Sequence, residues 1–147
     1  METILIQETD FEKARTKIKQ NKGKIIIFSG EDDELNRKIL EKEQINILLL
    51  NQSKRKDWQK QRNSGFNQVL AKIAKKNKVK IGINLDEILS SDSKAKAEIL
   101  ARIKQNIKLC NKSKLEMIFL GKASRDAYDL KSLGLALGMP TWMIKNL

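Results

Sequence analysis

The feature that most constrains the fold is a regular alternation of short apolar runs with longer segments of helical periodicity. Five runs rich in Ile, Leu, Val and Phe lie at residues 3–6, 24–28, 45–50, 79–85 and 115–120. Each run is apolar at successive positions, which is typical of parallel strands whose two faces are both covered by helices. The alternation therefore predicts an α/β fold with a parallel sheet.

Helical patterns fill the gaps between these runs. The apolar stripes pass through residues 11–18, 35–40, 66–74, 100–110 and 130–137. Thr9 and Glu12 have the spacing of a capping box, which predicts that the first helix begins at Thr9. The last helix is expected to end at Gly138, because glycine readily adopts the left-handed backbone that closes many helices.

The length limits how these units can be arranged. A chain of 147 residues fits one domain spanning 1–147, and no Pro-rich or Gly-rich linker divides it. Five or six strands are too few for a closed eight-stranded barrel, which takes about 250 residues. The pattern leaves two architectures open, a doubly wound open sheet and an incomplete barrel.

The absence of histidine excludes more functions than any motif suggests. Hydrolytic zinc sites and serine or cysteine nucleophiles usually depend on imidazole, and the chain contains none. Its single cysteine, Cys110, lies on an apolar helical stripe and is interpreted as a small buried hydrophobe. With no disulfide partner and no apolar stretch long enough to cross a bilayer, we expect a cytoplasmic protein without membrane contact.

The positive charge is concentrated in one part of the chain. The formal net charge is +12, and residues 52–80 carry ten basic side chains and one acidic side chain, whereas residues 1–51 carry nine and ten. This segment contains the loop after the third strand and the helix that follows. In parallel α/β folds such loops lie at the carboxyl ends of the strands, where ligands usually bind. The distribution predicts a site for a polyanion.

Lysines and arginines in this segment could neutralise phosphates, and an exposed indole could stack on an unpaired base. The alternative is a solvated charged face with Trp58 in the core. The one-sign cluster favours nucleic acid, and the predicted RNA-binding residues are Lys54, Arg55, Lys56, Trp58, Lys60 and Arg62, with Lys72, Lys75 and Lys76 on the following helix as a possible extension of the same surface.

Two separated motifs give the chain a family resemblance. Residues 54–57 (KRKD) with 64–72 (SGFNQVLAK), and residues 129–139 (DLKSLGLALGM), resemble the archaeal ribonuclease P protein component 3 family. The strand at 79–85 and the helix at 95–110 occur in the family's order. The resemblance covers most of residues 24–140.

The resemblance implies a TIM-barrel-like fold related to the PHP phosphoesterases, here an incomplete or minimal barrel of five to seven β-α units. It also implies a noncatalytic subunit of ribonuclease P, which binds and stabilises the catalytic RNA for removal of the 5′ leader from precursor tRNA. The implied partners are the RNase P RNA and the ferredoxin-like protein component 2, with precursor tRNA contacted indirectly. No cofactor is expected on this chain, and Mg²⁺ is expected with the RNA.

The sequence departs from the family pattern at three places. The stretch 58–65 replaces a Pro-Gly turn, Gln68 replaces a helix histidine, and Asp86 with Glu87 replaces an Arg-Pro pair. Two other functions stay open. The chain could be a protein-interaction scaffold with incidental RNA contact, or a phosphoesterase that uses carboxylates such as Asp86 and Glu87.

Overall fold

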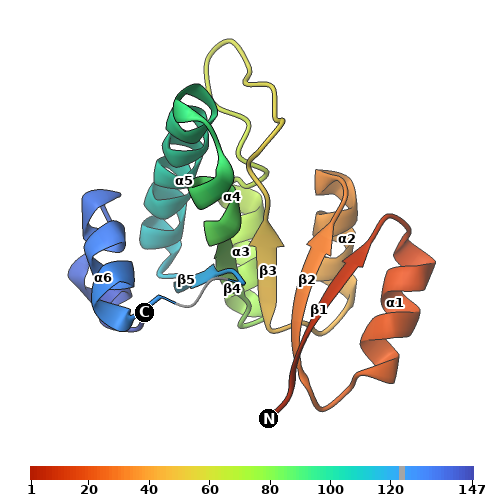
Figure 1. The fold of residues 1–147 in the computed structure, drawn as a ribbon. Coiled ribbons are helices and arrows are strands. Elements are labelled where there is room, and N and C mark those ends of the chain that lie inside the picture. The colour runs from red at the N-terminus through yellow and green to blue at the C-terminus, as the bar shows by residue number, and fades with distance from the viewer. Residues whose placement is uncertain (123–124) are drawn as a thin grey trace.

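The computed structural model of this protein describes residues 1–122 and 125–147 and contains a five-stranded parallel sheet (Figure 1). The strands lie side by side in chain order, and every neighbouring pair is parallel. The strands are β1 (Thr3–Glu8), β2 (Ile25–Gly30), β3 (Ile47–Leu50), β4 (Lys80–Asn84) and β5 (Met117–Leu120). All five apolar runs of the sequence therefore form strands, as predicted.

Helices follow each strand. They are α1 (Phe11–Gln20), α2 (Asp33–Lys42), α3 (Gln68–Lys76), α4 (Leu85–Ser90), α5 (Ser93–Ser113), α6 (Ala127–Ala136) and α7 (Thr141–Ile144). The five predicted helices are present, but α4 and α7 are not predicted, because one turn or so is too short to show periodicity. The first helix is capped by Asp10, whose carboxylate accepts from the Lys13 amide, so the predicted start at Thr9 is wrong by one residue.

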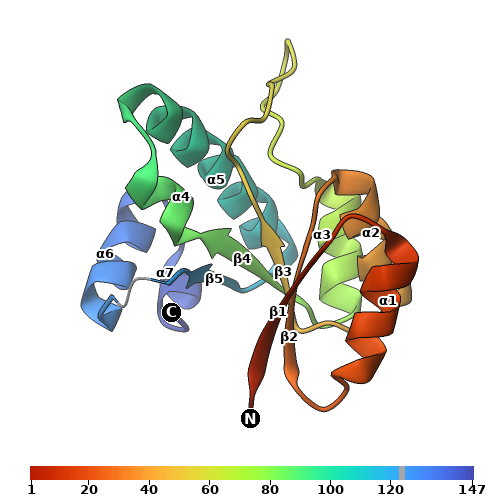
Figure 2. The same ribbon diagram turned by 45° about the vertical axis from the view of Figure 1, so that its right-hand side comes forward.

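One face of the sheet carries the main core, and the helices pack on that face (Figure 2). Alternate strand residues such as Phe28, Leu48 and Ile81 point into this core, where they meet Ile39 of α2 and Ile103 of α5. Because the strands follow chain order and their helices share one face, the fold is that of an incomplete barrel, and the doubly wound alternative is excluded.

The other face is not covered by helices, contrary to the expectation of a sheet covered on both sides. A second, smaller cluster of strand side chains covers this face instead. At Gly82 an added Cβ would lie 2.9 Å from Leu120 Cδ1 and 3.2 Å from Ile47 Cγ2, so the absence of a side chain there lets the neighbouring strands' side chains fold over β4. The strands are therefore apolar on both faces, because on the face without helices their side chains pack against one another.

The carboxyl ends of all five strands lie at one edge of the sheet. From this edge the longest connection, residues 51–67 between β3 and α3, projects above the sheet beside α5 (Figures 1 and 2). We refer to it as the β3–α3 loop. No helix in the described part of the chain is long and apolar enough to span a bilayer.

Candidate nucleic-acid interface

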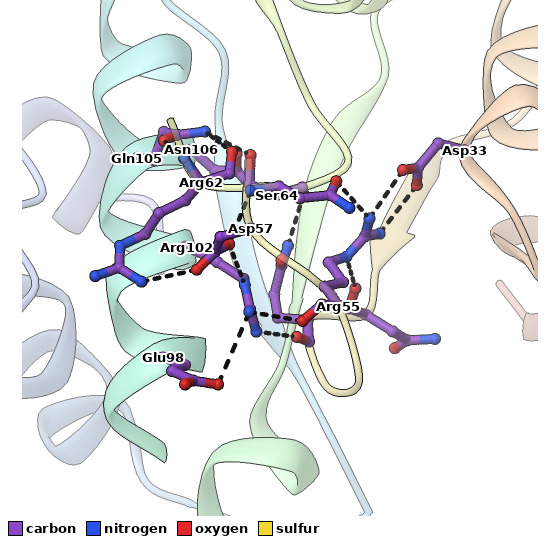
Figure 3. A network of polar contacts seen from close by, with 12 residues as sticks. Asp33, Arg55, Asp57, Arg62, Ser64, Glu98, Arg102, Gln105 and Asn106 are labelled. Atoms are coloured by element: carbon purple, nitrogen blue, oxygen red, sulfur yellow. Dashed lines mark hydrogen bonds and ion pairs between the residues drawn. The ribbon is translucent and has the colours of Figure 1, made fainter. Parts of the chain in front are cut away.

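The β3–α3 loop is fixed to α5 by a buried arginine, Arg102, and by the amide side chains of Gln105 and Asn106 on the same helix (Figure 3). The Arg102 residue is only 2% exposed. Its guanidinium donates to the carbonyl of Gln52 at 2.8 Å, to the carbonyl of Arg55 at 2.8 Å and to Asp57 Oδ1 at 3.0 Å. Three contacts on successive parts of the loop fix its backbone, so the loop has a defined shape despite lacking helix or strand.

Asp57 is the acidic partner inside the loop. It accepts from Arg102, from the Asn63 amide at 2.9 Å and from Arg62 at 2.9 Å. The hydrogen bond from Arg102 is the main cause that lowers the pKa of Asp57, and the Asn63 amide and the two arginine charges lower it further. The carboxylate is therefore ionised at neutral pH and closes the loop on itself.

Arg55 fixes the other side of the loop to α2. Its guanidinium donates to the two carboxylate oxygens of Asp33 at 2.8 and 3.0 Å, and its Nε donates to the carbonyl of Asn51 at 2.7 Å. Only 15% of the Arg55 side chain is exposed. Gly65 passes directly over this pair, since an added Cβ would lie 2.5 Å from Arg55 Nη2. Arg55 thus uses much of its charge to position the loop.

The remaining cations of the loop point into solvent. Lys54, Lys56 and Lys60 are exposed, and within residues 1–122 and 125–147 they form no ion pair. Trp58 lies in the same loop with 58% of its surface exposed, so it does not fill the core. Arg62 is paired with Asp57 but keeps 45% of its side chain exposed.

The helix lysines do not continue this surface in one piece. Lys72 lies on the exposed side of α3, and Lys75 and Lys76 lie in its last turn, at the opposite end of the sheet from the β3–α3 loop. Lys75 donates to the carbonyl of Lys114 at 2.9 Å, beside the end of α5. The structure therefore separates the predicted residues into two groups.

Asp86 and Glu87 both bind backbone amides. Glu87 accepts from the amides of Gln52 and Ser53 at 2.7 and 3.3 Å, and Asp86 accepts from the amide of Lys122 at 3.1 Å. Each carboxylate thereby holds a neighbouring loop at the carboxyl edge of the sheet. In the described parts of the chain no three potential metal ligands gather in one place. These contacts favour a structural role for both residues.

Cys110 of α5 is buried in the main core, as expected, and burial raises the pKa of its thiol to about 12. Arg102 lies on the same helix at an apolar-stripe position, between Ile99 and Ile103. Sequence reasoning missed Arg102 and Asp33. The signal for Arg102 was present, because a basic residue inside a helix's buried stripe needs an acceptor in the interior.

Comparison with known proteins gives a consistent result. The family model described as RNase P subunit p30 matches residues 3–141. Ribonuclease P protein component 3 of Methanococcus maripaludis is 30% identical over 127 residues, which make up 86% of this chain and 51% of the relative. The protein of the same name from Methanosarcina acetivorans is 32% identical over 113 residues, with 77% and 44% covered.

The fold also matches a solved structure. A chain in the cryo-EM structure of archaeal ribonuclease P with mature tRNA superposes with a TM-score of 0.80 and 26% sequence identity, over 96% of this chain and 62% of that chain. The present chain spans about half the length of the curated relatives that it matches.

Proposed function

The chain belongs to the RNase P subunit p30 family, and we propose that it is a noncatalytic, RNA-binding subunit of ribonuclease P. The observation that carries the proposal is the β3–α3 loop, which holds Lys54, Lys56 and Lys60 in solvent on a backbone fixed by two arginines. Lysines on a fixed backbone lose less conformational freedom when they meet a phosphate than lysines on a flexible segment do.

The contacts divide the loop residues by role. Lys54, Lys56 and Lys60 bind phosphates, Arg62 supports them with its exposed face, and Arg55 mainly positions the loop. Trp58 offers an exposed ring on which an unpaired base can stack. The structural neighbour belongs to an archaeal ribonuclease P solved with mature tRNA, which supports a tRNA-processing complex as the setting.

The chemistry is assigned to RNA, with Mg²⁺, and this chain contributes shape and charge. Asp86 and Glu87 support that division because both carboxylates bind backbone amides. By holding RNA strands together against their own repulsion, the loop lowers the concentration of Mg²⁺ that the catalytic RNA requires.

The test is a salt titration of RNA binding. The variant Lys54→Asn, Lys56→Gln, Lys60→Gln removes three charges, and asparagine suits position 54 because its φ is +61°. We expect the slope of log affinity against log salt to become shallower by about 2–3. A variant with Lys13, Lys94 and Lys131 changed to Gln, all exposed and outside the loop, should leave the slope unchanged. Equal slopes for the two variants would contradict the proposal.

Cleavage provides a second readout. Adding this chain to RNase P RNA should lower the Mg²⁺ concentration at which precursor tRNA is cleaved, and the loop variant should lose that effect. Cleavage of precursor tRNA by the chain alone, abolished in Asp86→Asn, would instead establish the carboxylate phosphoesterase.

A protein-interaction role is the second candidate, and exposed apolar residues on α6 favour it. Tyr128 is 85% exposed and Leu135 is 69% exposed. Under this function α6 binds protein component 2, and RNA contact is incidental. Capture of component 2 that is lost in Leu135→Asp, together with no RNA crosslink to residues 54–62, would favour this candidate over the first.

A further inference from the structure

The two ends of the sheet differ in charge. At the carboxyl edge, the loops after β2 and β4 carry acids, and among the described residues only the β3–α3 loop is strongly basic. At the opposite edge, where helices end and strands begin, lysines outnumber the acids. These lysines are Lys19, Lys22, Lys24, Lys42, Lys75, Lys76, Lys78, Lys80, Lys112 and Lys114. The acids near them include Glu2, Glu43 and Glu116, which are paired with Lys24, Arg15 and Lys80.

A pocket opens in the middle of this lysine edge. It has a volume of about 520 Å³ and lies between the turn after α3, the turn after α5 and Trp142 of α7. Lys75, Lys78, Lys80 and Lys114 line it. A pocket lined by four lysines and a single glutamate, which is paired with Lys80, fits an anionic ligand.

The side chains around the pocket are held in place. The Lys114 ammonium lies over the Trp142 ring at 5.6 Å, and the Trp142 indole donates to Asn111 Oδ1 at 2.9 Å. Lys80 is paired with Glu116 at 3.1 Å. Lys75 uses one of its three protons on the Lys114 carbonyl and keeps two for a ligand. The pocket is thus built before a ligand arrives.

The backbone of the two turns supports a role beyond folding. Within residues 1–122 and 125–147, the residues other than glycine with positive φ are all lysines, namely Lys54, Lys78 and Lys114. Glycine or asparagine is favoured at such positions, because a side chain there strains the backbone by roughly 1 kcal/mol. Lys78 and Lys114 close α3 and α5 with φ of +58° each, and both line the pocket. The side chain at each of these turns strains the backbone relative to glycine, while its positive charge suits a helix C-terminus. Strained positions of this kind cluster at ligand-binding sites, which points to a binding function.

We propose that this edge, with Lys75, Lys78 and Lys114 at its centre, is a second RNA-binding surface that takes the sugar–phosphate backbone. The choice of RNA as the ligand rests on the proposed function. Since the β3–α3 loop lies at the other end of the sheet, one domain contacts two RNA segments at once and holds them at a fixed separation.

The experiment compares salt slopes for two sets of substitutions in this chain bound to RNase P RNA. The edge variant is Lys75→Gln, Lys78→Asn, Lys114→Asn, where asparagine keeps the left-handed turns, and the loop variant is the one given above. We expect the edge variant to make the slope shallower by about 2–3 and the combined variant to show the sum of both effects. Thermal unfolding of each variant is the control. An unchanged Tm shows that the change in slope comes from the lost charges and not from a loss of folding.

The outcomes separate the two proposals. An effect of the loop variant alone would overturn the second surface and leave the proposed function intact. An effect of the edge variant alone would support the second surface and refute the loop. A competition experiment tests the choice of RNA as the ligand. If polyglutamate at equal charge concentration displaces RNA from the edge, the edge is a site for acidic proteins, and the RNA assignment is overturned.

Discussion

Replacing Arg102 by methionine tests how the interface is built. Methionine retains the unbranched stem within α5 and removes all three donor contacts to the loop. A hydrogen bond from a charged donor contributes about 1.5–3 kcal/mol. Water can replace part of the loss at Asp57, whose side chain is 26% exposed, whereas Gln52 is 2% exposed and its carbonyl is left without this donor.

We therefore expect Arg102→Met to lower the free energy of unfolding by roughly 3–5 kcal/mol, in the range for breaking a buried pair. In a domain near 150 residues each kcal/mol changes Tm by about 2–4 °C, so Tm should fall by about 6–20 °C. Circular dichroism measures this, and limited trypsin digestion should show faster cleavage within residues 53–63.

The control is Arg37→Gln, which breaks an exposed pair with Glu41 on α2. We expect less than about 0.5 kcal/mol from it. If Arg102→Met lowers Tm no more than Arg37→Gln does, or if the loop is digested at the wild-type rate, the loop is ordered by something other than Arg102.

Three other residues provide further tests of the structure. Because the folded-state pKa of Asp57 is lowered, the stabilisation by its carboxylate is present above about pH 4 and is lost as pH falls through that lowered pKa. In urea unfolding, Asp57→Asn should be less stable than the wild type at pH 7, and this difference in unfolding free energy should shrink toward pH 3. A difference that stays constant with pH would contradict this. Cys110 should react with a thiol reagent only at the rate of unfolding, since its thiol is buried with a pKa of about 12; fast reaction in native buffer would show an accessible thiol. Gly82→Ala should lower the free energy of unfolding in urea by about 1–3 kcal/mol, because its methyl group would meet Leu120 Cδ1 at 2.9 Å. An unchanged unfolding midpoint would mean that the Leu120 side chain moves aside at no cost.

The sequence alone determined the secondary structure and its order. Apolar spacing depends on neighbours within a few residues, so it located all five strands and the long helices. Sequence also determined that imidazole chemistry is absent and that the loop after β3 is basic. The family motifs at 54–72 and 129–139 gave the family, which the family model over residues 3–141 confirms.

Only the tertiary structure decided how those elements use their charges. Arg55 meets Asp33 from 22 residues away, and Arg102 meets Asp57 from 45 residues away, so no local pattern could pair them. The same applies to Lys75, which α3 carries to the far edge of the sheet, beside Lys114 and away from the loop that precedes it in the chain. The basic residues of 52–80 lie in one stretch of the sequence. Because α3 runs antiparallel to β3, the loop before α3 and the end of α3 lie at opposite ends of the sheet.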